Sequence, residues 1–226
     1  MKIAIMQPTF MPWLGYFAMI REVDKFVILD HVQFNRRSWQ QRNQILNNQI
    51  VKWLSVPVYQ KGNYEEKIKN IKINYNQNFP QKILNQIYEG YKNAKYFSLF
   101  YEYLENIFKK EFIFLCDLNS YFIKSIAKEL SFTTEFINSS DLDLAGSKDK
   151  LIFNICKKLN ANFYLSPEGS KNYIDNSNYF TESKINLNYH TYKHPKYKQI
   201  SNSFVSHLSI IDLIFNEGFI EAKKII

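Results

Sequence analysis

The chain has 226 residues, a net charge of +8 at neutral pH and a hydrophobic share of 46%. Disordered chains contain far fewer hydrophobic residues, so this composition predicts a folded protein with a sizeable core. The apolar stretches are too short to span a bilayer or to form a signal peptide, and the two isolated cysteines provide no disulfide or zinc framework. We therefore expect a cytoplasmic protein with free thiols.

The positive charge favours an anionic partner, which is nucleic acid, a membrane surface or a phosphorylated small molecule. The lysines are spread along the chain, and the densest basic group, Arg36, Arg37 and Arg42, lies among amide, serine and tryptophan residues. This pattern favours a local anion site over a long nucleic-acid track.

The first third of the chain is rich in predicted strands. Residues 3–6 form a short apolar run typical of a buried strand, and a turn at Pro8 and Pro12 leads into a helix. Residues 26–29 and 53–58 predict two further strands, and the alternating residues 68–73 predict another. One face of the predicted helix is formed by Trp13, Tyr16, Phe17 and Ile20.

The middle of the chain changes to helical spacing, with apolar residues at i, i+3 and i+4 between residues 83 and 91 and between 100 and 108. Two or three consecutive helices are predicted here. The aromatic stripe between residues 96 and 114 has the same spacing, so we interpret it as core packing rather than as a stacking platform.

Strands and helices alternate again in the last part of the chain. Residues 133–137, 163–165 and 185–189 predict strands, and Ser147 is a candidate cap for a helix that follows the first of them. Residues 166–170 predict a loop. Ser209 is interpreted as a helix N-cap, in a capping-box-like pair with Asp212, rather than as a nucleophile.

This order of elements predicts an α/β protein with a Rossmann-like layered sheet, parallel or mixed, and a helical insert in the middle of the chain. Neither a long linker nor an internal repeat interrupts the sequence. We therefore expect one domain over residues 1–226, with a helical subdomain at about residues 80–131.

The first candidate site follows the first predicted strand, at Gln7, Pro8, Gly15 and Tyr16. A glycine in the first helical turn lets a ligand or a backbone segment approach closely, and a helix N-terminus offers N–H donors and a positive dipole to phosphate. The alternative is that the prolines only shape a turn over packed aromatic side chains. The sequence has neither a Walker loop nor a Gly-x-Gly-x-x-Gly motif.

The second candidate site is the polar segment 30–43, which follows the second predicted strand. Open α/β sheets bind ligands beyond the carboxyl ends of their strands, so this segment stands where a site is expected. Arg42 is suited to grip a phosphate or carboxylate, Trp39 to stack on a base or sugar, and Asp30 or His31 to move a proton. The alternative is a helix cap at Asp30 beside solvated arginines.

The third candidate site is the segment 190–199, which is rich in histidine, tyrosine and lysine. His190 and His194 would be spaced as metal ligands on a helix, but Pro195 disfavours a helix here, so we predict no metal site. His194 is a candidate general base because imidazole titrates near neutral pH, with a structural histidine as the alternative.

Several short motifs follow one another in a recognisable order over nearly the whole chain. They are Gln7-Pro8, Gly15-Tyr16-Phe17, Asp24-Lys25-Phe26-Val27, Val32-Gln33-Phe34, Trp39, Arg42-Asn43, residues 53–58, Tyr164-Leu165, Gly169, Tyr173, residues 192–199 and residues 209–218. In this order they resemble the WbqC-like protein family. The candidate substrate-binding residues taken from these motifs, beyond those given above, are Gln33, Asn43, Gly169, Tyr173, Tyr192, Tyr197 and Gln199.

The resemblance implies an enzyme of bacterial surface polysaccharide biosynthesis, in the O-antigen or capsule, that forms an amide on a nucleotide-linked amino sugar. Its second substrate is then an acyl or amino-acid donor, either pre-activated or activated with ATP. The family usually shows two adjacent acids where this chain has Asp30-His31, so a two-carboxylate mechanism is not carried over. A nucleic-acid-binding module and a non-catalytic scaffold of the polysaccharide pathway stay open as alternatives, and so does a homo-oligomeric state.

Overall fold

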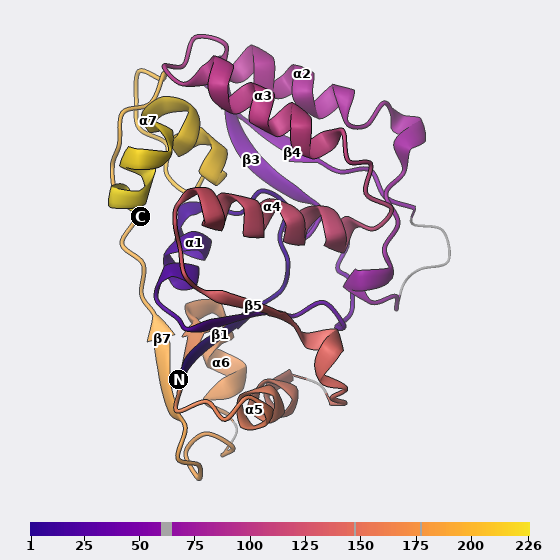
Figure 1. Ribbon diagram of the computed structural model, residues 1–226, viewed down its shortest axis with the longest axis vertical. Coiled ribbons are helices and arrows are strands. Elements are labelled where there is room, and N and C mark those ends of the chain that lie inside the picture. Colours follow the sequence, from indigo (N-terminus) through magenta and orange to yellow (C-terminus); the bar gives the residue numbers. More distant parts are fainter. Residues whose placement is uncertain (60–64, 147, 177) are drawn as a thin grey trace.

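The computed structural model describes residues 1–59, 65–146, 148–176 and 178–226 (Figure 1). The strands are β1 (Lys2–Met6), β2 (Lys25–Ile28), β3 (Arg42–Asn47), β4 (Ile50–Ser55), β5 (Glu135–Asn138), β6 (Phe163–Pro167) and β7 (Asn186–His190). The α-helices are α1 (Leu14–Arg21), α2 (Gln81–Tyr91), α3 (Phe97–Phe108), α4 (Leu115–Glu129), α5 (Lys148–Lys158), α6 (Lys171–Ile174) and α7 (Ile210–Ile225). Short 3₁₀ turns are η1 (Ile68–Asn70), η2 (Tyr75–Gln77), η3 (Ser139–Leu142) and η4 (Glu168–Ser170).

Among the described residues, the five strands β5, β2, β1, β6 and β7 lie side by side in this order and run parallel to one another. The first three of these strands in the chain are β1, β2 and β5, and β2 and β5 lie on one side of β1. The chain then crosses back and adds β6 on the other side of β1. Ile3 at the centre lies opposite both Lys25 and Tyr164. A sheet with this order has its ligand crevice beyond the carboxyl ends of the two strands at the switch, here β1 and β6.

Helices cover both faces of the sheet, because successive side chains of a strand point to opposite faces. Ala4, Phe26 and Ile28 belong to one core, together with residues of α1 and α4. Ile3 and Val27 belong to a second core, together with residues of α5 and α6. In Figure 1, α1 and α4 accordingly lie above the sheet, and α5 and α6 lie below it. This layering confirms the α/β class and the Rossmann-like sheet predicted from the sequence.

The antiparallel hairpin of β3 and β4 extends the first core away from the sheet, with α2 and α3 packed beyond it (Figure 1). Helix α2 approaches β3 very closely at Gly90, where an added Cβ would lie 2.6 Å from the carbonyl oxygen of Leu46. Tyr91 joins three elements, since its hydroxyl accepts the N–H of Leu46 and donates to Asp212 on α7. These contacts fix the hairpin against the helical part of the molecule.

Most elements predicted from periodicity are present. The strands predicted near residues 3–6, 26–29, 133–137, 163–165 and 185–189 are the five strands of the sheet. The consecutive helices predicted in the middle of the chain are α2, α3 and α4, and the stripe residues Phe100, Leu104, Ile107 and Phe108 are buried in the core, as predicted. Ser209 caps α7, accepting the N–H of Ile211. The other predicted cap, Ser147, lies outside the described residues.

Two strand predictions were wrong or misplaced. The strand predicted at residues 53–58 begins earlier, at Ile50, and ends at Ser55, two residues before Pro57, which has no N–H to extend a ladder. Residues 68–73, predicted as a strand, form η1 followed by isolated bridges. The segment instead crosses the core as a loop, and Ile68, Ile71 and Ile73 are all buried there.

Other expectations failed at the ends of elements and in the polar segment. Trp13 precedes α1 as its N-cap and does not belong to its buried face. The loop predicted at residues 166–170 is instead the end of β6 followed by η4. Strand β3 was missed, because amide and arginine residues dominate its sequence. Asp212 does not complete a capping box, since its carboxylate oxygens bind Tyr91, Tyr197 and Gln199.

Helices with the length and apolar character needed to cross a bilayer do not occur in the described part of the chain.

Candidate functional site

Three adjoining cavities open beyond the carboxyl ends of β1 and β6, and we call them together the sheet-end cleft. The first, of about 320 Å³, lies at the switch itself, between Gln7 and Pro167. The second, of about 240 Å³, shares Met6, Thr9 and Trp39 with the first. The third, of about 520 Å³, also shares Gln7 and reaches α5. The sheet-end cleft therefore lies where open α/β sheets bind their ligands.

The turn that follows β1 is held by hydrogen bonds from β3 and from the start of α7. Asn43 donates its side-chain N–H groups to the carbonyl oxygens of Phe10, at 3.1 Å, and Met11, at 2.7 Å. The hydroxyl of Ser209 donates to the same carbonyl of Met11 at 2.7 Å. Asn43 is buried and borders the second cavity. Its main contribution is thus to hold the wall of the cleft in place.

A second buried amide, Asn119 on α4, joins the same turn to the segment before β3. It donates to the carbonyl oxygen of Gln40 at 2.7 Å and to that of Pro8 at 3.3 Å. Gln40 in turn donates its side-chain N–H to the side-chain oxygen of Gln7 at 2.8 Å. Gln7 and Gln40 both line the first cavity. The predicted first and second candidate sites are therefore joined in one wall.

Aromatic rings form the wall of the second cavity. Trp13, Tyr16 and Trp39 all line it. An added Cβ on Gly15 would lie 2.3 Å from the indole of Trp13, so this glycine makes room for a side chain of the protein itself. Tyr16 is buried, donates its hydroxyl to the carbonyl oxygen of Gln7 at 3.2 Å, and has its pKa raised well above 10 by burial. Trp39 is 50% exposed, so much of its ring is available to a ligand.

Two histidines lie at the outer edge of this aromatic wall. The ring of His207, which lines the second cavity, stacks on Trp13 at 5.1 Å. His194 lies behind it, with the two imidazole centroids 5.0 Å apart. His194 Nδ1 lies 2.8 Å from the carbonyl oxygen of Pro195, so it carries the proton, and the buried Nε2 has no hydrogen-bond partner among the described residues. Burial lowers the pKa of His194.

Tyr192 packs against the same group of rings. Its ring meets Trp13 edge-on at 5.4 Å and stacks on His190 at 5.8 Å. Its buried hydroxyl has no hydrogen-bond partner within the described part of the chain, and burial raises the pKa of Tyr192 to about 12. The third candidate site, residues 190–199, is therefore connected to the sheet-end cleft by the contact between Tyr192 and Trp13.

The third cavity contains the one lysine or arginine among the described residues that line the sheet-end cleft. Lys148 begins α5 and lines this cavity together with Gln33 and Asn35. A lysine at the start of a helix adds its charge to the positive end of the helix dipole. This end of the cleft is therefore the one suited to an anionic group.

Asp30 and His31 lie outside the lining of the sheet-end cleft. The carboxylate of Asp30 accepts hydrogen bonds from the hydroxyls of Ser139, at 2.9 Å, and Ser140, at 2.7 Å, and from the N–H of Ser140. His31 Nδ1 lies 2.6 Å from the same Ser139 hydroxyl, and burial lowers the pKa of His31. The pair joins the ends of β2 and β5, and the arrangement is that of a structural link.

Arg42 also lies away from the cleft lining. Its guanidinium lies 4.1 Å from the ring centroid of Trp53, and Trp53 meets Trp39 at 5.2 Å. Tyr197 and Gln199 are buried, and both donate to the carboxylate of Asp212, at 2.8 and 2.7 Å. These three predicted site residues thus contact neighbouring parts of the protein.

The remaining two predicted site residues lie in the region after β6. Gly169 is exposed within η4, and an added Cβ there would meet nothing within 4 Å. Its neighbour Ser170 lines the first cavity. The side chain of Tyr173 lies outside the described part of the structure.

Several residues of the cleft were not predicted from the sequence. His207 is distant from the other motifs and reaches the cavity with a left-handed backbone, at φ 62°, which no pattern indicates. Trp13 was assigned to a helix face. Lys148 could have been found, because the helix after a strand of a parallel sheet begins at the edge that binds ligands. Clusters of three or more metal-ligating side chains do not occur among the described residues.

Comparison with known proteins gives one consistent result. The model of the WbqC-like protein family matches residues 7–224. A protein of Mycobacterium tuberculosis described as "Uncharacterized protein Rv1507c" is 32% identical over 219 residues, which are 96% of this chain and 94% of that protein. The search of solved structures returned no match.

Proposed function

Because the chain belongs to the WbqC-like protein family, we propose that it is an enzyme that forms an amide on a nucleotide-linked amino sugar. The acyl or aminoacyl group comes from an activated donor or is activated with ATP. The observation that carries the proposal is the sheet-end cleft at the switch between β1 and β6, which joins an exposed indole, a histidine and a lysine. The proposed substrate class belongs to cytoplasmic steps of surface polysaccharide synthesis.

The cleft offers one group for each part of such a substrate. Lys148 and the start of α5 suit the diphosphate, which needs a cation and N–H donors. Trp39, half exposed between the first and second cavities, suits stacking on the base or the sugar. The distribution supports a ligand that extends from the third cavity toward the aromatic wall.

We assign the general base to His207, which lines the second cavity and is backed by His194. In the proposed reaction the sugar ammonium loses a proton to the imidazole, and the freed amine attacks the acyl carbon. The C–N bond forms as the bond from the acyl carbon to the leaving group of the donor breaks, and that group departs with the bonding electron pair. One of the two protons still on the nitrogen then passes to the departing group, which leaves a neutral amide. Imidazole is the side chain most often used as a general base, and it is suited to this role.

The test uses purified full-length protein with dTDP- or UDP-linked 3-amino and 4-amino deoxysugars, ATP and a series of acyl and aminoacyl donors. We expect a mass increase of one acyl group on the sugar, measured by mass spectrometry. His207→Gln should lower kcat/KM by about 100-fold or more, the usual size of a general-base contribution. His190→Gln is the matched control, since His190 lines none of the three cavities.

Lysine variants separate binding from chemistry. Lys148→Met should weaken binding of the sugar nucleotide about tenfold, equivalent to about 1.4 kcal/mol. Lys150→Met, two residues further along α5 and outside the cleft lining, should leave it unchanged. If the sugar nucleotide binds but no donor of the series gives a product, the result contradicts the proposed enzyme and favours the non-catalytic scaffold. If the sugar nucleotide does not bind, the result contradicts both hypotheses.

A further inference from the structure

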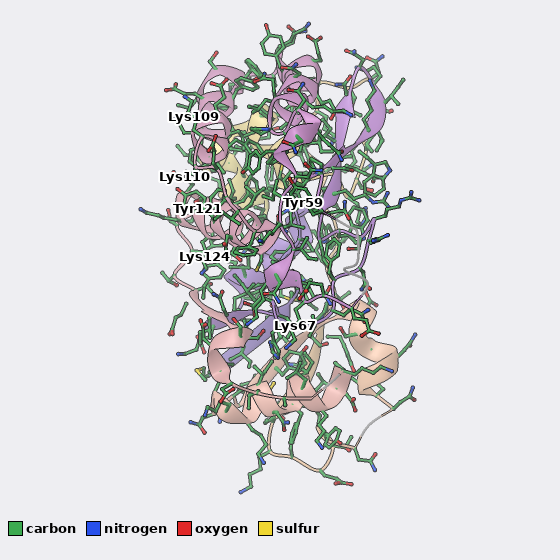
Figure 2. The ribbon with its side chains drawn as sticks, turned by 90° about the vertical axis from the view of Figure 1, so that its right-hand side faces the viewer. Tyr59, Lys67, Lys109, Lys110, Tyr121 and Lys124 are labelled. Atoms are coloured by element: carbon green, nitrogen blue, oxygen red, sulfur yellow. The ribbon has the colours of Figure 1, made fainter. Side chains whose placement is uncertain are left out.

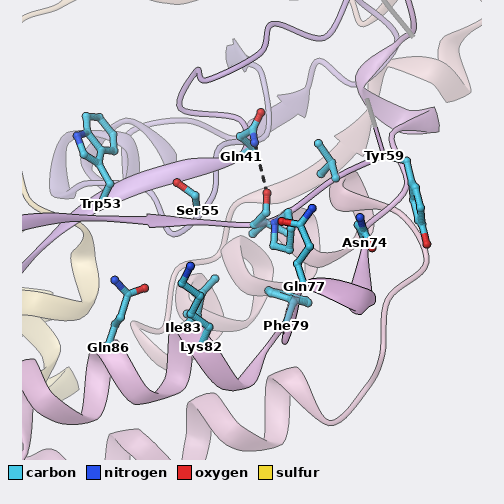
Figure 3. Close-up of a pocket in the computed structure, with 13 residues that line it drawn as sticks. Gln41, Trp53, Ser55, Tyr59, Asn74, Gln77, Phe79, Lys82, Ile83 and Gln86 are labelled. Carbon is cyan, nitrogen blue, oxygen red and sulfur yellow. Dashed lines mark hydrogen bonds between the residues drawn. The ribbon is translucent and has the colours of Figure 1, made fainter. Parts of the chain in front are cut away.

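A further cavity, separate from the sheet-end cleft, lies between the β3–β4 hairpin and α2, and we call it the hairpin cavity (Figure 3). Its volume of about 750 Å³ is within the range of small-molecule sites. Figure 3 shows Gln86 and Lys82 rising from α2 on one side and Trp53 and Ser55 on β4 on the other. Nothing in the proposed acyl transfer uses this space.

Uncharged hydrogen-bonding side chains dominate the rim of the hairpin cavity. Gln77, Gln86 and Ser55 line it, and their side chains have no hydrogen-bond partner among the described residues. Asn74 lines it too and uses its side-chain oxygen for the N–H of Asn76. A carboxamide both donates and accepts, as does a hydroxyl. Such a rim matches a ligand whose own groups do both, which is the property of sugar hydroxyls.

The floor and the ends of the hairpin cavity are apolar or aromatic. Val58, Phe79 and Ile83 are buried beneath it, and the rings of Trp53 and Tyr59 border it at 38% and 47% exposure. A pyranose ring presents C–H groups on its faces and hydroxyls around its edge. An apolar floor with exposed aromatic borders and a polar rim therefore fits such a ring in shape and polarity.

Charge narrows the ligand class further. Among the described residues that line the hairpin cavity, Lys82 is the one lysine, arginine, aspartate or glutamate. Nucleic acid and polyphosphates need several cations along their backbone. A single ammonium group instead suits one carboxylate, such as that of a uronic acid, or a neutral sugar hydroxyl.

We propose that the hairpin cavity is a saccharide-binding site, which takes a pyranoside and favours one that carries a single carboxylate. It lies close to the sheet-end cleft, because Trp53 of the hairpin cavity and Trp39 of the cleft are 5.2 Å apart. The site extends beyond the proposed acyl transfer and does not depend on it.

The experiment uses the full chain and three probes: methyl β-glucoside, methyl β-N-acetylglucosaminide and methyl β-glucuronide, each titrated by saturation-transfer NMR. We expect millimolar binding of at least one, tightest for the glucuronide. The double variant Gln77→Ala/Gln86→Ala should weaken binding at least tenfold, and Lys82→Met should remove the preference for the glucuronide. Gln81→Ala is the matched control, since Gln81 is exposed on the same helix and its side chain bonds to Asn85 instead.

Two results would overturn the proposal. One is that none of the three glycosides binds the wild-type protein when it is titrated from about a 20-fold molar excess up to the solubility limit of the probe. A weak site, of roughly millimolar affinity, would be detected in this range. The other is binding that survives the Gln77→Ala/Gln86→Ala change in a folded protein. Because these probes carry no nucleotide, no free amine and no activated acyl group, failure here leaves the proposed acyl transfer untouched, and failure of that reaction leaves this site untouched.

Discussion

Asp212 is a buried carboxylate that lies among three hydrogen-bond donors from two segments. Tyr91 donates to one of its oxygens, and Tyr197 and Gln199 donate to the other. Burial raises the pKa of Asp212, and the three hydrogen bonds act in the opposite direction. Since a buried carboxylate without such partners is costly, the donors are needed for α7 to pack against α2.

Asp212→Asn should lower the free energy of unfolding by about 1–3 kcal/mol, because the new NH₂ group must face a donor and leave it unsatisfied. Tyr197→Phe removes one donor without adding a conflict and should cost about 1 kcal/mol. Urea denaturation of both variants measures the difference. An Asp212→Asn protein as stable as Tyr197→Phe would show that the carboxylate is already protonated and donates in the native state.

His194 links stability to pH. Burial lowers its pKa from the ordinary value of 6.5, so the unfolded chain takes up a proton at a higher pH than the folded protein does. Between these two pKa values the unfolded state binds more protons, and stability therefore falls as the pH drops below about 6.5. Burial lowers the pKa of His31 and of His190 in the same direction.

We expect the urea midpoint to decrease between pH 7.5 and pH 5.5, and His194→Asn to make this decrease smaller. Asparagine can still donate to the carbonyl oxygen of Pro195, so the local hydrogen bond has a replacement. If His194→Asn leaves the pH dependence of the urea midpoint unchanged, the decrease comes from the other histidines.

At the scale of elements, the close approach of α2 to β3 depends on Gly90. An alanine there would bring its Cβ to 2.6 Å from the backbone carbonyl of Leu46, which cannot rotate away as a side chain could. The better helix propensity of alanine, worth about 1 kcal/mol, opposes this clash. Moving the helix would also disturb Tyr91, which bonds to β3 and α7.

Gly90→Ala should therefore reduce the free energy of unfolding by about 1–3 kcal/mol, the usual cost of overpacking. Gly169→Ala is the matched control, since its new Cβ meets nothing within 4 Å, and it should change stability by less than about 0.5 kcal/mol. Thermal and urea unfolding of both variants give the comparison. Equal stability of the two would mean that α2 shifts without cost.

At the scale of the whole molecule, part of the positive charge gathers on one side. Figure 2 labels Lys67, Lys109, Lys110 and Lys124 on this side, with Tyr59 and Tyr121. All six side chains are exposed, and the ammonium of Lys110 lies 5.0 Å from the ring of Tyr121. This face is the feature that favours the alternative of a nucleic-acid-binding module.

We expect a single-stranded oligonucleotide to bind this face only nonspecifically, with a Kd of about 1–100 µM at physiological salt that weakens steeply as salt increases. The triple change Lys109→Gln, Lys110→Gln and Lys124→Gln should reduce that binding and leave sugar-nucleotide binding unchanged. Fluorescence anisotropy at two salt concentrations is the measurement. Nanomolar, salt-resistant binding would instead make nucleic acid the principal ligand.

The sequence by itself determined the class of the fold. Apolar runs near residues 3–6, 26–29 and 163–165 became neighbouring parallel strands, since burial on both faces demands such runs. The helical spacing of the middle segment was equally clear. The spacing of apolar residues indicates which face of an element is buried, and this is enough to identify most strands and helices.

Only the tertiary structure decided which polar residues face the sheet-end cleft. Asp30 and Arg42 had the chemistry of a site, yet one binds Ser139 and Ser140 and the other stacks on Trp53. His207 and Lys148 reach the cleft from segments far apart in the chain. The direction in which a polar side chain points depends on contacts between distant segments. Such contacts produce no periodic pattern of residues in the sequence.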